Sequence, residues 1–129
     1  MSKDHAIHNE NTCDYLLQSG QFNDWVVTTA FYSALHYVCN EIFPLEQNGL
    51  IYNNFEIYYR IIFKSNASKK SKHDVIISLV SLYLPMCKRA YMSLFDWCMA
   101  SRYTNYIVSS QVASNARKDL EHIKRHLSK

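Results

Sequence analysis

The sequence predicts an all-α fold, an antiparallel bundle of four or five helices in a single domain that spans residues 1–129. The chain has only 2 Gly and 2 Pro, too few for the many turns of an all-β sandwich or barrel. Hydrophobic residues make up 48% and charged residues 19%, a balance that excludes an intrinsically disordered chain. Apolar residues also recur with helical spacing along most of the sequence.

A short turn separates the first two predicted helices. The first helix is expected over residues 6–19, with Gly20 just after its end, where glycine is favoured. The second helix is expected to begin with Asn23 or Asp24 as its N-cap and to end before Pro44.

The second and the last predicted helices have the strongest apolar patterns. In the second helix, apolar residues follow Val27 at offsets 4, 7, 8, 11 and 15. In the last helix, which Ser109 or Ser110 is expected to cap, they follow Val112 at offsets 4, 8, 11 and 15. Both patterns indicate one buried face on a helix.

The chain between these two helices is less regular. Residues 44–54 are expected to form a loop. Residues 55–63 (FEIYYRIIF) are aromatic and fit a short helix or a strand, of which we favour the helix. Residues 65–71 (SNASKKS) are the most polar stretch and are expected to be a second loop.

A third long helical pattern begins at Lys72 or His73 and continues to Tyr103 through Pro85. Proline either kinks one long helix or occupies the first turn of a second helix after a break at Leu84. We favour a break or a strong kink.

Cellular location and redox state follow from the apolar segments. The first ten residues contain no apolar run, so no signal peptide is expected, and the window Val75–Leu84 is too short to cross a bilayer. We expect a cytoplasmic protein without membrane contact, metal or cofactor. Its cysteines lie in helical patterns without Cys-x-x-Cys spacing, so we expect buried, reduced thiols. They are Cys13, Cys39, Cys87 and Cys98.

The two halves of the chain differ in charge. Residues 1–59 have seven acidic side chains and one basic one, whereas residues 60–129 have thirteen basic and four acidic. Basic clusters lie at residues 64–73 and 117–129. Either the acidic half packs against the basic half, within the fold or in a dimer, or the clusters form a surface for a phosphate backbone. We favour the first, because the pI near 8.6 is modest.

A polar stripe lies opposite the apolar face of the second predicted helix. Tyr32, His36 and Asn40 recur every four residues. We favour a buried His36 that is hydrogen-bonded between helices. The alternative is a small polar pocket in which Arg102 binds an anion.

Lys69, Lys70 and Lys72 lie at a predicted helix N-terminus. The helix dipole disfavours cations there, by a few tenths of a kcal/mol each, roughly. We therefore predict that these lysines contact an anion: RNA, or an acidic patch on a partner protein or a second subunit. The alternative is a solvated loop that contacts nothing.

Residues 24–38 (DWVVTTAFYSALHYV) resemble the second helix of a group of small bacterial HEPN-like proteins, in which an aromatic or Asp-Trp start precedes Ala-Phe-Tyr-x-Ala-Leu-His. Residues 16–24 (LLQSGQFND) fit the entry to that helix. Residues 91–94 and 100–103 resemble the group's Tyr-x-x-Leu and Ala-Arg-Tyr elements. The chain departs from the pattern at Ile76, where the group has Arg.

The resemblance covers about residues 12–43 and 73–127, and it implies a helical bundle that commonly dimerises. Many HEPN proteins are metal-independent endoribonucleases; others are inactive and bind nucleotides, nucleic acids or proteins. The family's nuclease motif is Arg, a short spacer, then His, which Arg117 and His122 match. A histidine would take the ribose 2′-hydroxyl proton and an arginine would stabilise charge on the phosphate. Helix geometry, however, separates these two side chains by about 140°.

These observations lead to three alternative hypotheses for the function of the chain. We favour a non-catalytic HEPN-like interaction module, a homodimer that binds a partner protein or RNA in a bacterial defence or stress system. The aromatic content and the charge asymmetry favour the dimer. The second hypothesis is a toxin, a metal-independent endoribonuclease that uses Arg117 and His122. The third is a small inhibitor or antitoxin whose acidic N-terminal half blocks a partner's nucleic-acid site.

Overall fold

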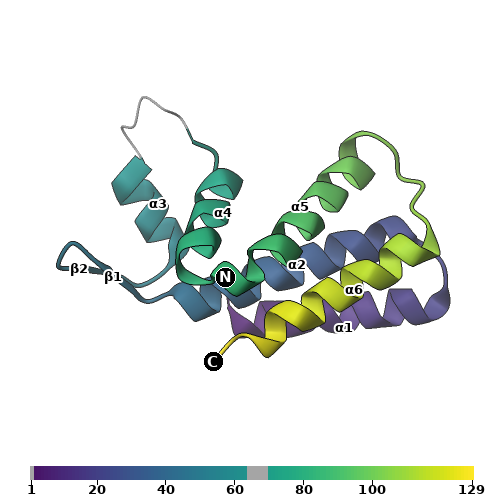
Figure 1. Cartoon of the computed structure of the whole chain (residues 1–129), viewed down its shortest axis with the longest axis horizontal. Helices are drawn as coiled ribbons and strands as arrows, with labels where there is room; N and C mark the ends of the chain where they lie inside the picture. Colours follow the sequence, from purple (N-terminus) through teal and green to yellow (C-terminus); the bar gives the residue numbers. More distant parts are fainter. Residues whose placement is uncertain (1, 64–69) are drawn as a thin grey trace.

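The computed structural model describes residues 2–63 and 70–129 and is mostly helical. These residues contain six α-helices rather than four or five, with one short 3-10 helix and one two-stranded sheet (Figure 1). In chain order the elements are α1 (Lys3–Ser19), α2 (Asn23–Ile42), β1 (Leu45–Gln47), β2 (Leu50–Tyr52), α3 (Phe55–Phe63), α4 (Lys72–Tyr83), η1 (Pro85–Cys87), α5 (Lys88–Tyr103) and α6 (Ser110–Arg125).

Helix α2 is the centre of the bundle, because it contacts α1, α4, α5 and α6. Helices α1 and α2 form one hairpin and α5 and α6 form another, packed against the first (Figure 1). Helices α3 and α4 and the small sheet lie together at one end of this four-helix arrangement. The fully buried side chains include Phe31, Tyr91 and Leu120, so the core joins both hairpins.

Capping residues decide where α1 begins and ends. The Ser2 hydroxyl accepts a hydrogen bond from the His5 N–H, so the helix begins a few residues before the predicted start. Gly20 is left-handed, with φ 72°, and donates its N–H to the Leu17 carbonyl. The predicted end at Gly20 is confirmed.

The N-cap predicted for α2 is wrong. Neither Asn23 nor Asp24 is the cap; the capping position is Phe22, which is left-handed (φ 57°) and makes no side-chain capping bond. The Asn23 amide instead donates to the Val108 carbonyl at 3.1 Å and ties the α1–α2 turn to the α5–α6 loop. The Asn23 side chain therefore makes a long-range hydrogen bond instead of capping α2.

Residues 44–54 are not the expected loop without regular structure. Strands β1 and β2 pair antiparallel, with Leu45 opposite Tyr52. Asn48 and Gly49 between them both have positive φ, 55° and 78°. That backbone suits a two-residue hairpin turn, for which Asn-Gly is the strongest sequence signal.

The break predicted at Pro85 is confirmed. Helix α4 ends at Tyr83, Pro85 occupies the first position of η1, and the chain bends by 119° before α5 continues. The missing N–H of proline falls where a helix start leaves that donor unused. In the two described ranges, no single helix has the length and apolarity to cross a membrane; only the bent pair of α4 with η1 and α5 passes that test, jointly.

The four cysteines all lie in the described part of the chain and are buried free thiols, as expected. Burial is the main cause that raises the pKa of Cys13 to about 11 and that of Cys39 to about 12. Neutral thiols at these positions act as small apolar core side chains.

Candidate functional site

Helix α6 has two basic faces that point to different neighbours. Arg117 and Lys124, seven residues apart, share one face; Lys118, His122 and Arg125, at offsets 0, 4 and 7, share the other. We call the first the paired basic face. The second, together with Arg89 of α5, is called the exposed basic face.

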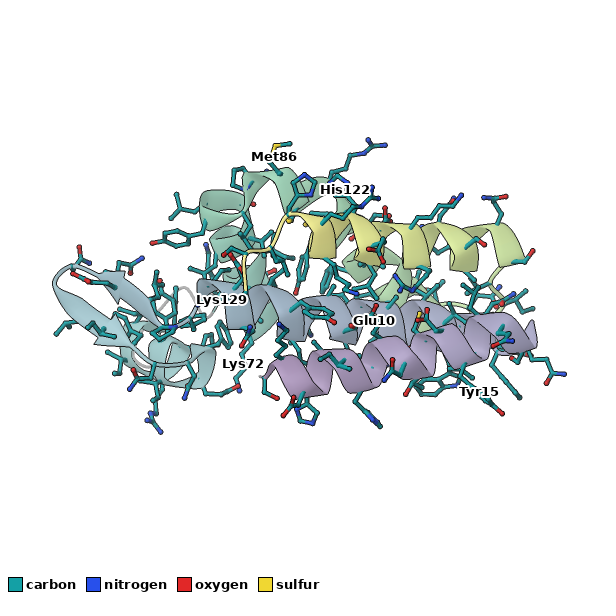
Figure 2. The ribbon with its side chains drawn as sticks, turned by 90° about the horizontal axis from the view of Figure 1, so that it is seen from below. Glu10, Tyr15, Lys72, Met86, His122 and Lys129 are labelled. Atoms are coloured by element: carbon teal, nitrogen blue, oxygen red, sulfur yellow. The ribbon has the colours of Figure 1, made fainter. Side chains whose placement is uncertain are left out.

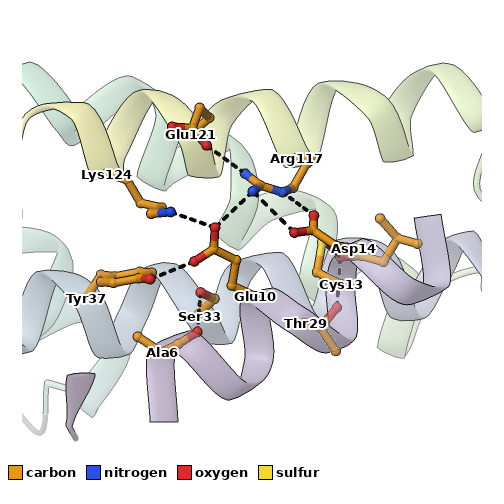
Figure 3. A network of polar contacts seen from close by, with 11 residues as sticks. Ala6, Glu10, Cys13, Asp14, Thr29, Ser33, Tyr37, Arg117, Glu121 and Lys124 are labelled. Atoms are coloured by element: carbon orange, nitrogen blue, oxygen red, sulfur yellow. Dashed lines mark hydrogen bonds and ion pairs between the residues drawn. The ribbon is translucent and has the colours of Figure 1, made fainter. Parts of the chain in front are cut away.

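The paired basic face lies against acids of α1 (Figure 3). The Arg117 guanidinium is 2.9 Å from Glu10 through Nη2, donates to Asp14 through Nε, and is 3.3 Å from Glu121 through Nη1. The side chains of Arg117 and Glu10 are only 18% and 11% exposed, respectively. Burial alone lowers the pKa of Arg117, but Asp14 and Glu10 outweigh that effect and raise it. Arg117 thus stays charged within the bundle.

Glu10 is the centre of this network. Its Oε2 also lies 2.6 Å from the Lys124 ammonium, and its Oε1 accepts a 2.6 Å hydrogen bond from the Tyr37 hydroxyl (Figure 3). Burial and the bond to Glu10 raise the pKa of Tyr37, so the hydroxyl keeps its proton and donates. The acidic half of the chain therefore packs against the basic half within one fold, as the favoured interpretation of the charge asymmetry predicts.

The structure does not bring Arg117 and His122 together. Arg117 points toward α1, whereas His122 Nε2 lies 3.1 Å from the Met86 carbonyl in η1, on another side of α6 (Figure 2). This placement agrees with the angle of about 140° that helix geometry gives for five residues. The hydrogen bonds of Arg117 go to carboxylates of its own chain.

The exposed basic face borders a pocket between α5 and α6, called the α5–α6 pocket. Its cavity volume is about 340 Å³. Three full positive charges surround it, those of Arg89, Lys118 and Arg125, and all three side chains are exposed. Among the described residues, these three cations form no ion pair. The lining residues are Arg89, Ala90, Ser93, Lys118, Asp119, His122 and Arg125.

One carboxylate also lines the α5–α6 pocket. Burial raises the pKa of Asp119, while a hydrogen bond with Ser93 and the charge of Arg89 act in the opposite direction. One carboxylate against three cations leaves the pocket positive. His122 is half-buried, and its bond to Met86 orients the ring. Guanidinium and ammonium groups around one hollow suit a phosphate or another anion.

Sequence reasoning missed Arg89, Lys118, Asp119 and Arg125 as site residues. A signal was present, because Lys118, His122 and Arg125 have the spacing of one helical face. Their approach to Arg89 depends on the antiparallel packing of α5 on α6, which a spacing within one helix does not reveal.

The structure describes two of the three lysines predicted to bind an anion before α4. Lys69 lies outside the described residues, and Lys70 is exposed. The Lys72 ammonium is 2.9 Å from Glu56 in α3, and Asp74 provides the acid in the first turn of α4. Lys72 therefore has an anionic partner within its own chain, and the contact of the lysine cluster with an external anion stays a prediction.

The residues of the polar stripe of α2 have different neighbours, and the pocket between them stays a prediction. Tyr32 accepts a 2.7 Å hydrogen bond from Arg102 of α5, so Arg102 already has a partner. The His36 ring lies 4.7 Å from that of His5 in α1. The main-chain oxygen of Asn40 accepts a bond from the C-terminal lysine. The three residues contact three different parts of the fold.

His36 was expected to be buried and hydrogen-bonded between helices, but in the described ranges its buried Nδ1 atom has no hydrogen-bond partner. Burial is the largest cause that lowers the pKa of His36 to about 4 from its ordinary value of 6.5, followed by the charge of His5. His36 is therefore neutral in the folded protein near neutral pH.

We expect the free energy of unfolding to fall as the pH is lowered from 6.5 to about 5. In this range the unfolded chain binds a proton at His36 that the folded protein does not, so acid favours unfolding. Urea unfolding at pH 7.5 and 5.5 measures this effect. His36→Gln should reduce the pH dependence, whereas His8→Gln, at an exposed position, should leave it unchanged. Equal pH dependence in wild type and His36→Gln would contradict the prediction.

One end of the bundle, at the α1–α2 turn and the α5–α6 loop, exposes large apolar side chains. They are Phe22, Trp25, Tyr103, Tyr106 and Ile107. Exposed aromatic surface was one reason to expect a homodimer. The other reason, charge asymmetry, is met in part by ion pairs inside the chain, between Glu10 or Asp14 and the bases Arg117 and Lys124. The homodimer stays a prediction.

Comparisons with known proteins add no family to this description. No family model, curated protein or solved structure matches the chain. The α5–α6 pocket and the network around Glu10 are the features of this chain that bear on its function.

Proposed function

We propose that this chain is a non-catalytic, HEPN-like helical module that binds RNA through the α5–α6 pocket. The observation that carries the proposal is the division of α6 into two basic faces. Acids of the N-terminal half neutralise the paired basic face, while the exposed basic face borders a pocket and forms no ion pair within the described residues.

The paired basic face supports the non-catalytic part of this proposal. RNA cleavage by the Arg–spacer–His motif would need Arg117 near the scissile phosphate and His122 near the ribose 2′-hydroxyl. Glu10 and Asp14 bind the guanidinium of Arg117 instead. A phosphate would have to displace two carboxylates from a half-buried site to reach it, which costs several kcal/mol, roughly.

The exposed basic face supports RNA as the ligand. RNA carries one charge on every phosphate, so one strand can contact several cations at once and release the counterions bound to it. Arg89, Lys118 and Arg125 converge on one hollow from two helices. The bundle holds both helices in place, because Leu94 and Leu120 on their opposite faces are buried in the core.

Replacing Arg89, Lys118 and Arg125 together by Gln should weaken binding of a fluorescein-labelled single-stranded RNA by roughly tenfold to 100-fold at low salt. If three phosphate contacts are lost, the slope of log affinity against log salt should fall by about 2. Fluorescence anisotropy over a series of salt concentrations measures both quantities. All three side chains are exposed, so the fold should be retained.

The matched control replaces three exposed cations outside the pocket, Lys3, Arg60 and Lys129, by Gln. It removes the same net charge and should change affinity and slope much less. Equal losses in both triple variants would show that only overall charge matters and would overturn the assignment to the pocket. No RNA binding by the wild-type chain would overturn the proposal as a whole.

A further inference from the structure

Trp97 lies on α5 one turn beyond the residues that line the α5–α6 pocket. It follows Ser93, a lining residue, by four positions on α5 and therefore lies on the same flank of the helix, one turn further toward the α5–α6 loop. Its side chain is 43% exposed, although an indole is one of the largest apolar groups in the chain. A large aromatic ring is thus exposed one turn beyond the pocket that the three cations line.

The neighbouring turn of α6 presents a polar group at the same level. Ser93 and Asp119 line the same pocket from α5 and α6, and the two helices run antiparallel, so one turn toward the loop leads to Trp97 on α5 and Asn115 on α6. Asn115 is exposed, and its side-chain oxygen accepts a bond from Gln111. That bond directs the amide donors of Asn115 away from Gln111.

We propose that the RNA strand is single-stranded, with phosphates in the α5–α6 pocket and one base stacked on Trp97. This inference rests on the proposed function and names its ligand class. Aromatic stacking next to a basic groove is how proteins bind single strands, since every unpaired base offers a flat face. In a duplex both faces of a base are covered by its neighbours in the stack, so Trp97 has no partner there.

The test uses the intrinsic fluorescence of Trp97. The chain has 2 Trp, and Trp25 lies at the start of α2, so Trp25→Phe leaves Trp97 as the single indole. Titration of this variant with a 12-nucleotide RNA should quench Trp97, whereas the same sequence in a duplex should quench it little. In the wild-type background, Trp97→Ala should weaken single-strand binding about tenfold, and Trp97→Phe, which keeps a ring, should retain most of the affinity.

Two results separate this inference from the proposed function. If the RNA binds with a salt-dependent affinity that needs the exposed basic face, but Trp97→Ala binds as tightly as wild type, the stacking inference is wrong and the proposed function stands. If single strand and duplex bind equally and quench equally, the preference for single strands is wrong. A loss of about tenfold in Trp97→Ala, together with an unchanged melting curve and retained binding by Trp97→Phe, would support the inference.

Discussion

Arg117→Ala is expected to lower the free energy of unfolding by about 3 kcal/mol. The substitution leaves Glu10 buried with Lys124 and Tyr37 as its remaining partners and removes the link from α6 to Asp14. Removing one member of a buried ion pair is costly because the other charge loses its compensation. Urea unfolding, followed by the helical circular dichroism signal, measures the change in the free energy of unfolding through the shift of the midpoint.

Lys118→Ala is the matched control, since Lys118 is the next residue on α6 and is exposed. It should change stability by no more than about 0.5 kcal/mol. The Arg117→Ala variant should still bind RNA under conditions where it remains folded, because the paired basic face lies away from the α5–α6 pocket. An Arg117→Ala protein of unchanged stability that had lost a ribonuclease activity would instead favour the endoribonuclease hypothesis.

Phe31→Ala should destabilise the fold by about 3–5 kcal/mol. Phe31 has no exposed surface and packs near the rings of Tyr91 at 5.6 Å, Phe95 at 5.7 Å and His73 at 5.8 Å between centroids. These rings come from α4 and α5, so the loss leaves a cavity where three helices meet. Such a change is a large share of a typical stability of about 5–15 kcal/mol.

Phe22→Ala tests the same chemical change at a position where the side chain is 62% exposed. It should alter the midpoint of thermal unfolding little, whereas Phe31→Ala should lower it by roughly 10 °C or more. Similar midpoints for the two variants would show that Phe31 does not have the central packing role that the structure gives it.

The sequence alone predicts most of the helical elements, because their signals are local. The spacing of apolar residues after Val27 and Val112 predicts α2 and α6, and Gly20 and Pro85 mark a helix end and a break through their own backbone properties. The hairpin at Asn48 and Gly49 also had a local signal, which the loop prediction did not use. The fold class and most helix boundaries could therefore be obtained without tertiary information.

Helix caps show where local reasoning fails. Asn23 is a good N-cap by type, yet its amide bonds to Val108, which lies 85 positions further along the chain. Lys72 appeared to need an external anion until α3 placed Glu56 beside it. In both cases the side chain binds a residue far away in the sequence, whereas the local sequence suggested a different partner.

The sequence by itself determined that the chain is helical, how its charges are divided between the two halves, and which residues of α6 share a face. Only the tertiary structure decided what surrounds each basic side chain of α6. Arg117 forms ion pairs with Glu10 and Asp14. Lys118 and Arg125 line a pocket together with Arg89. The physical reason is that helical periodicity fixes directions within one helix, whereas charge compensation depends on which helix packs against each direction. Here α1 covers one basic face of α6 with acids, and α5 leaves the other basic face open.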